Sequence, residues 1–280
     1  MGCSVDTEKG VQLNTASAKD GYCIAVLKAL FRDKDDSIER TQKDAAISQC
    51  VQLAQQDDTF ALLQLGLFRA GGHWDYHITE TPMGYYQKSA KLGHVISQYN
   101  LGYRYREGIG CTRSYTEAHK WIRIAAERGY NLAMTGLGGL YDFGKGVPQD
   151  FKQAVEWYRR AADCKEPMAF HNLGMSYLHG EGVEQDASKA AELFCQGAAL
   201  GNLEATHNYA KLLLNGNGIE KDEKKAFEFF SKAAEKEHAW SLYRLGLCYE
   251  DGIGTTVNWK EAKKLYLKAA SLHISPAEVA

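Results

Sequence analysis

A spacing of 36 residues recurs through most of this 280-residue chain, and a sequence with such a period is typical of a repeat architecture. A leucine followed by a glycine, here called the repeat glycine, marks each copy, and one copy carries Tyr209-Ala210 instead. A small residue lies five positions before it, often a tyrosine three after, and a Gly-x-Gly pair six and eight after. The Leu-Gly pairs are Leu65-Gly66, Leu101-Gly102, Leu137-Gly138, Leu173-Gly174 and Leu245-Gly246.

The residue pattern of each repeat predicts two antiparallel helices. The small residue, the leucine and the tyrosine are four positions apart, so they form one stripe on the first helix. That helix is expected to end at the Gly-x-Gly pair, because glycine adopts positive φ angles most readily. A polar residue just ahead of the second helix is a start signal; these residues are Asp150, Asp186, Asp222 and Asn258. One hairpin cannot bury its apolar stripe alone, so the repeats are expected to stack.

This pattern resembles the Sel-1-like repeat family, which is related to the tetratricopeptide repeats. One copy, for instance, carries Ala133, Leu137-Gly138, Tyr141, Gly144-x-Gly146 and Trp157 in the family's positions. The resemblance implies an all-α fold, a right-handed α-solenoid of two-helix, 36-residue Sel-1-like repeats, with six copies over residues 59–274. The first copy departs from the pattern at residues 70–74 and at Pro82, where alanine is expected.

The segments outside the six copies are expected to differ from them. Residues 1–20 are polar and predict a flexible N-terminal tail. Residues 21–58 predict a degenerate capping repeat with helices over 22–31 and 41–55, because the ends of a solenoid need a polar outer face. Residues 275–280 are interpreted as the start of a further repeat or as a C-terminal cap.

The charge balance argues against two kinds of partner. Thirty-three basic and 35 acidic side chains give a formal net charge of −2. The chain therefore lacks the basic surface expected of a nucleic-acid binder or of polybasic attachment to lipid. No run of 18 apolar residues occurs, so we expect no transmembrane segment.

The first residues leave the location open. Residues 1–20 lack the apolar region of a signal peptide, and Asp6 stands where N-myristoylation needs Ser or Thr. Gly2-Cys3-Ser4 is compatible with the end of a bacterial lipoprotein signal, in which case Cys3 is the lipidation site and the protein is periplasmic. The alternative is an ordinary frayed terminus on a cytoplasmic protein.

The residues that could carry chemistry form no catalytic motif. Neither Gly-x-Ser-x-Gly nor His-Glu-x-x-His occurs, and the seven cysteines occupy different repeat positions, which favours buried thiols. His73, Asp75 and His77 lie close in sequence, but two histidines do not make a zinc site. The sequence therefore predicts no enzyme, no cofactor and no metal; a metal-dependent enzyme using those three residues is the opposing hypothesis.

A partner-binding face follows from helix geometry and the resemblance together. The first helix packs through positions −5, −1 and +3 from the repeat glycine, so its opposite face holds −3, +1 and +4. In tetratricopeptide-type solenoids that face lines the concave groove, and here it has the Tyr-rich composition of an interface core. The predicted partner-binding residues are Tyr99, Tyr103, Arg106, Asp142, His171, Met175, His207, Lys211, Tyr243 and Glu250. The alternative is that half of these residues pack against the next repeat.

The resemblance implies a non-catalytic protein that binds another protein. One specific hypothesis is a lipoprotein immunity protein whose concave face embraces a phospholipase-type, lipase-like toxin of type VI secretion and blocks its active site. The Gly2-Cys3-Ser4 start, the near-neutral charge and the aromatic face fit that role. The alternative is an intracellular or secreted-effector adaptor for signalling or complex assembly, in which Cys3 has no part.

Overall fold

The computed structural model describes residues 40–71 and 80–272, and every regular element in these ranges is an α-helix. The packing divides the chain into two compact units, Met1–Asp150 and Phe151–Ala280. The predicted all-α fold is confirmed. The expected tail 1–20, the expected helix over 22–31 and the segment 275–280 lie outside the described residues.

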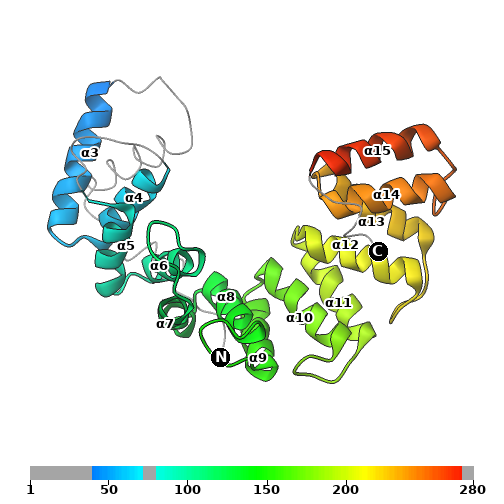
Figure 1. Cartoon of the computed structure of the whole chain (residues 1–280), viewed down its shortest axis with the longest axis horizontal. Helices are drawn as coiled ribbons and strands as arrows, with labels where there is room; N and C mark the ends of the chain where they lie inside the picture. The colour runs from blue at the N-terminus through cyan, green and yellow to red at the C-terminus, as the bar shows by residue number, and fades with distance from the viewer. Residues whose placement is uncertain (1–39, 72–79, 273–280) are drawn as a thin grey trace. The chain divides into compact units, whose positions relative to one another are not determined.

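The first unit contains six described helices, drawn in blue to green in Figure 1. They are α3 (Arg40–Gln55), α4 (Thr59–Ala70), α5 (Pro82–Lys91), α6 (Val95–Glu107), α7 (Tyr115–Glu127) and α8 (Asn131–Asp142). Each helix packs against the next one along the chain. Helix α3 confirms the helix expected over 41–55, and the succession of helices is the predicted stack of two-helix repeats.

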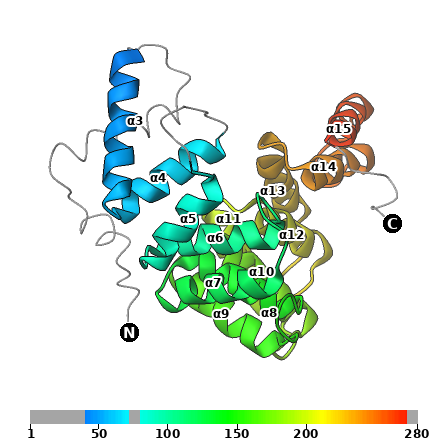
Figure 2. The ribbon, with the colours of Figure 1, turned by 60° about the vertical axis from the view of Figure 1, so that its left-hand side comes forward.

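The second unit continues the same alternation. Its helices are α9 (Phe151–Asp163), α10 (Pro167–His179), α11 (Ala187–Ala199), α12 (Leu203–Asn215), α13 (Glu223–Glu235), α14 (Ala239–Asp251) and α15 (Trp259–Ser271). Neighbours in sequence pack together, and α10 also contacts α12, the first helix of the following repeat. Figure 2 shows the helices of this unit following one another toward α15. One hydrophobic core extends from α11 to α15, with Phe194 and Phe230 fully buried.

Three of the four predicted start signals are the N-caps of second helices. The side chains of Asp186 and Asp222 each accept the backbone N–H three residues later at 2.9 Å, and Asn258 does so at 3.2 Å. These bonds satisfy N–H groups that the helix leaves without a partner. Four first helices end at a glycine in the left-handed region: Gly108, Gly180, Gly216 and Gly252.

The departure at Pro82 is explained by a late helix start. Helix α5 begins at Pro82, with Thr81 as its N-cap, whereas α7 in the next repeat begins at Tyr115, three residues earlier in the register. Proline is well tolerated in the first turn, because its missing N–H would have no helical partner there. The result is a helix of 10 residues in place of 13.

The repeat glycine allows the two helices of one repeat to approach closely. A Cβ on Gly174 would lie 2.6 Å from the ring of Phe194, and a Cβ on Gly246 would lie 2.5 Å from the ring of Tyr266. An alanine at either place would overlap the ring. The Leu-Gly column therefore reflects packing inside the repeat.

Candidate interaction surfaces

Tyr103 and Arg106 form an exposed pair on α6 in the first unit. Tyr103 is 38% exposed, and the guanidinium carbon of Arg106 lies 4.9 Å from the centre of its ring. The carboxylate of Glu107 accepts a hydrogen bond from Arg106 Nε at 2.7 Å. Tyr103 also borders a hollow of about 270 Å³, together with Ile109. A ring and a cation held in contact at the surface offer a partner both apolar area and charge.

Tyr99, the third member of the predicted trio, belongs to the packing between repeats. It is half-buried, and its ring meets that of Tyr130 edge to face at 5.3 Å between centroids. Tyr130 is the N-cap residue of α8, the first helix of the next repeat. Asp142 is half-buried in the last turn of α8. Tyr103 and Arg106 therefore contact each other at the surface, whereas Tyr99 packs between repeats.

In the second unit, three predicted residues also pack against the following repeat. The amide nitrogen of Asn208 on α12 lies 3.4 Å from His171 Nδ1 and 3.7 Å from the sulfur of Met175. His207 is only 8% exposed and cannot serve as a surface contact. Its ring lies 5.5 Å from that of Phe230. His207 is therefore a packing residue, whereas His171 and Met175 contact the next repeat but stay half-exposed, so their predicted role in binding remains a prediction.

His207 is part of a buried polar network between α12 and α14. Its Nδ1 lies 3.0 Å from the hydroxyl of Ser241, and that hydroxyl lies 2.8 Å from Nδ1 of His238. His238 Nδ1 also accepts the backbone N–H of Ser241 at 3.3 Å, which caps α14. His238 Nε2 lies 3.2 Å from a carboxylate oxygen of Glu204. Ser241, His238 and Glu204 have the spacing of a catalytic triad, but Ser241 has no exposed surface that a substrate could reach.

A Ser–His pair like that of Ser241 and His238 also occurs in the first unit. Ser97 and Ser241 occupy the small-residue column where other copies have alanine, and a histidine precedes each by three residues, His94 or His238. Ser97 Oγ lies 3.1 Å from His94 Nδ1 and 2.7 Å from the hydroxyl of Ser89. By size alone these serines are equivalent to the alanines of the other copies. The paired histidine was the signal that they are polar packing residues.

Burial controls the charge of this network. It lowers the pKa of His207 to about 3, with the neighbouring His238 and Lys211 acting in the same direction. The contact with His238 holds the pKa of Glu204 below its usual range. Burial, followed by repulsion from Arg244, lowers the pKa of Lys211. His207 is therefore neutral in the folded protein near pH 7.

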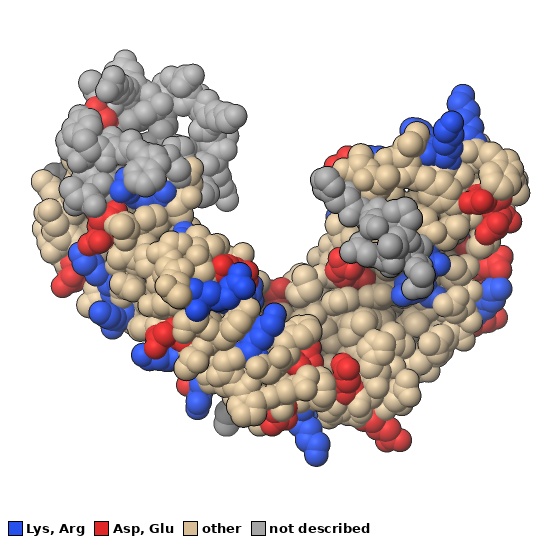
Figure 3. Space-filling model, viewed as in Figure 1, with Lys and Arg blue, Asp and Glu red and all other residues tan. Residues whose placement is uncertain are grey.

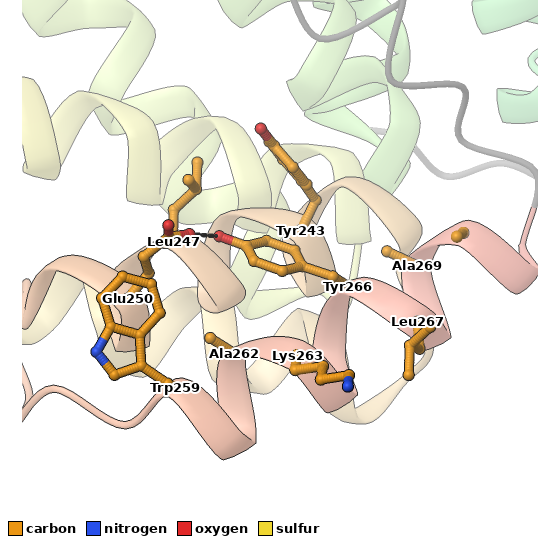
Figure 4. Close-up of a pocket in the computed structure, with 10 residues that line it drawn as sticks. Tyr243, Leu247, Glu250, Trp259, Ala262, Lys263, Tyr266, Leu267 and Ala269 are labelled. Carbon is orange, nitrogen blue, oxygen red and sulfur yellow. Dashed lines mark hydrogen bonds between the residues drawn. The ribbon is translucent and has the colours of Figure 1, made fainter.

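Tyr243 and Glu250, the last two predicted residues, line a groove between α14 and α15. Its volume is about 740 Å³. Figure 4 shows Tyr243, Leu247 and Glu250 from α14 facing it from one side and Trp259 and Tyr266 from α15 on the other. The hydroxyl of Tyr266 donates a hydrogen bond to Glu250, and this ring lies 5.5 Å from that of Tyr243. The surface is apolar and exposed, since Trp259 is 65% accessible.

Neither the Tyr103–Arg106 surface nor the groove between α14 and α15 is distinguished by charge of one sign. In the view of Figure 3, Lys and Arg alternate with Asp and Glu over both units. Many ion pairs join neighbouring turns of one helix, such as Arg123 with Glu127 at 2.7 Å. Exposed pairs of this kind contribute little to stability, because water and salt screen them. Aromatic and apolar side chains, rather than one sign of charge, distinguish the candidate surfaces.

The cysteines agree in part with the prediction that they are buried thiols. Cys50 and Cys248 are buried, the latter with a free thiol, whereas Cys195 is free and exposed. Burial raises the pKa of the Cys248 thiol to about 11, so its reactive thiolate is scarce at neutral pH. Among the described residues no group of three His, Cys, Asp or Glu side chains is arranged to hold a metal ion. The candidate metal residues at 73, 75 and 77 lie outside those residues.

These features define an α-solenoid of short helical repeats that offers surfaces for another macromolecule. The chain belongs to the Sel1 repeat family, whose model matches more than half of its length. The matched segments are residues 83–94, 95–130, 131–165, 167–202, 203–238 and 241–273. Sel1 repeats are a fold for protein–protein interaction, and within the described residues no helix is long and apolar enough to span a membrane.

Solved structures show the same fold. A Sel1 repeat protein from Oxalobacter formigenes is 25% identical with a TM-score of 0.78, over 91% of this chain and 99% of that one. A protective antigen of uropathogenic Escherichia coli with an SLR fold is 27% identical with a TM-score of 0.74, over 83% of this chain. The match spans 50% of the antigen's length. No similar sequence was found among curated proteins.

One more distant structure is an immunity protein from Pseudomonas aeruginosa. It is 14% identical with a TM-score of 0.49, over 91% of this chain and 83% of that one. A likeness at this level does not bear on the function of this chain.

Proposed function

We propose that this chain is a non-catalytic solenoid that binds and occludes a partner protein, with Tyr103 and Arg106 at the centre of one contact surface. The observation that carries the proposal is the stacked, exposed Tyr103–Arg106 pair. Tyr and Arg dominate the binding energy of many interfaces, because each combines a large contact area with a polar group. Asp142 and Lys211 are half-buried and contribute to the rim of such surfaces in this proposal.

The specific version of this proposal is a lipoprotein immunity protein that neutralises a phospholipase-type toxin. The near-neutral charge supports it, because a strongly charged surface would favour other partners. The Gly2-Cys3-Ser4 sequence supports a lipid anchor at Cys3 and a periplasmic location; Cys3 lies outside the described residues. The mechanism is steric: the solenoid covers the entrance to the toxin's active site.

The test is capture of the partner from envelope and cytosolic fractions, followed by binding measurements with purified proteins. The double variant Tyr103→Ala/Arg106→Ala is expected to weaken binding at least about tenfold, because both hot-spot side chains are removed. Phe143→Ala is the matched control, since Phe143 is an aromatic residue of the same unit that is 69% exposed. It should bind as the unchanged protein does.

The identity of the captured partner separates the versions of the proposal. A lipase-like enzyme from the envelope, inhibited by the solenoid but not by the double variant, supports the immunity function. A cytosolic complex that depends on the same two residues supports the adaptor function instead. Unchanged binding by the double variant would overturn the α6 surface.

A further inference from the structure

Two positively charged side chains, Lys211 on α12 and Arg244 on α14, occupy repeat positions that contact each other. Lys211 stands at position +1 of its copy and Arg244 at position −2 of the next copy. In the preceding pair of repeats the same two positions hold Met175 and Asn208, whose side chains lie 3.7 Å apart. The register therefore brings Arg244 beside Lys211, and both side chains are half-buried.

The electrostatics of the surrounding groups agree with this placement. Burial, followed by repulsion from Arg244, lowers the pKa of Lys211. The pKa of His207 is lowered first by burial, and the charges of His238, Lys211 and Arg244 add to this effect. His207 is neutral near pH 7, so it does not compensate the two positive charges. Two like charges this close together repel each other, and partial burial strengthens the repulsion.

No carboxylate of residues 40–71 and 80–272 forms an ion pair with either cation. Other lysines of the same unit have such a partner, for instance Lys189, whose ammonium lies 3.0 Å from Glu192. Glu204, the acidic residue nearest to this network in sequence, lies 3.2 Å from His238 Nε2 and does not act on Lys211. Partial burial of a cation costs free energy unless an opposite charge pairs with it. The two side chains therefore form a half-built site for an anion.

Apolar side chains border the two cations. Leu214 stands three residues after Lys211, on the same side of α12. Met175, on the other side, contacts Asn208, which stands three residues before Lys211. Met175 and Leu214 pack against the core of the unit but keep part of their surface exposed. These neighbours fit an acidic side chain next to apolar ones better than the continuous charge of a nucleic-acid backbone.

We propose that Lys211 and Arg244 together bind a carboxylate of a partner protein, from an aspartate or glutamate that lies beside apolar residues. The lysine ammonium and the planar guanidinium carry only donors, so one carboxylate can accept hydrogen bonds from both. This inference rests on the proposed function in one respect, namely that the partner is a protein. The site belongs to the second unit and does not involve the Tyr103–Arg106 surface.

The test selects short random peptides, displayed on phage, for binding to the full chain. Peptides that also bind the double variant Lys211→Met/Arg244→Asn are removed; this variant carries the residues that the preceding repeats have at the same positions. The enriched peptides are expected to share an aspartate or glutamate with apolar neighbours. Changing that acid to its amide should weaken binding to the unchanged chain at least about tenfold, and should barely change binding to the double variant. Fluorescence anisotropy measures the four affinities.

A second measurement separates recognition from a structural role. Because the double variant removes the repulsion, it is expected to raise the Tm by about 2–4 °C while it loses peptide binding. A variant that lost binding through damage to the fold would instead have a lower Tm. Lys224→Met is the matched control, since it removes one exposed positive charge of the same unit outside this site. It should bind the peptides as the unchanged protein does.

Five results would overturn the proposal. Two concern the peptides and the fold: enriched peptides that share no acidic residue, and a Tm of the double variant below that of the unchanged protein. Two assign the site to another occupant: a peptide from residues 1–39 or 273–280 of this chain, or a single-stranded DNA oligonucleotide, that binds through Lys211 and Arg244. The last is equal loss of peptide binding in Tyr103→Ala/Arg106→Ala, which would place the peptides on the α6 surface. Failure of that double variant to weaken partner binding would instead count against the proposed function alone.

Discussion

Replacing Gly218 by alanine is expected to lower the free energy of unfolding of the second unit by about 2–5 kcal/mol. Gly218 has a φ of 70°. In this left-handed conformation a Cβ would lie too close to the following carbonyl oxygen. A Cβ there would also overlap the carbonyl group of Ala187, the first residue of α11. Backbone atoms at a helix start cannot rotate away as a side chain can, so the repeat must shift. Chemical denaturation followed by circular dichroism measures the loss.

Gly110 supplies the matched control for this prediction. It holds the corresponding place in another Gly-x-Gly pair, with φ of 72°, but a Cβ there meets no atom of residues 40–71 or 80–272 within 4 Å. Gly110→Ala should therefore cost only the backbone conformation, about 1–2 kcal/mol. Equal losses for the two variants would contradict the role of Gly218 in contact between repeats.

Acidification is expected to destabilise the second unit between pH 7 and pH 5. The pKa of His207 is about 3 when folded and about 6.5 when unfolded. Below pH 6.5 the unfolded state binds a proton that the folded state does not, so the free energy of unfolding falls as pH falls. The loss reaches about 2 kcal/mol at pH 5 and continues toward pH 3. Burial lowers the pKa of His171 as well, which adds to the trend.

The variant His207→Asn tests the assignment to this ring. Asparagine keeps a donor near Ser241 but does not titrate. We expect it to be less stable than the unchanged protein at pH 7.5 and to lose less stability between pH 7.5 and pH 5. Denaturant midpoints at the two pH values measure the difference in slope. A pH dependence as steep as that of the unchanged protein would mean that other groups cause it.

The period, the pairs of helices and the polar starts of the second helices could be predicted from the sequence, because each depends on a short stretch of chain. Asp186 is recognisable as an N-cap because it stands three residues before the N–H that its side chain accepts. Gly-x-Gly is recognisable as a turn because positive φ is a property of one residue. The reason for the second glycine of each pair was not recognisable, since Gly218 contacts a residue 31 positions earlier.

The candidate surfaces required the tertiary structure. Tyr99, His207 and Tyr243 occupy the same repeat position, and a helical wheel treats them alike. In the structure Tyr99 meets Tyr130, His207 is buried against Ser241, and Tyr243 faces an open groove. The difference comes from what the following repeat places against each residue. The sequence alone determined the repeat, its helices and their turns, because these follow from local backbone preferences and spacing. Only the tertiary structure decided which side chains remain exposed, because burial depends on contacts between residues distant in sequence.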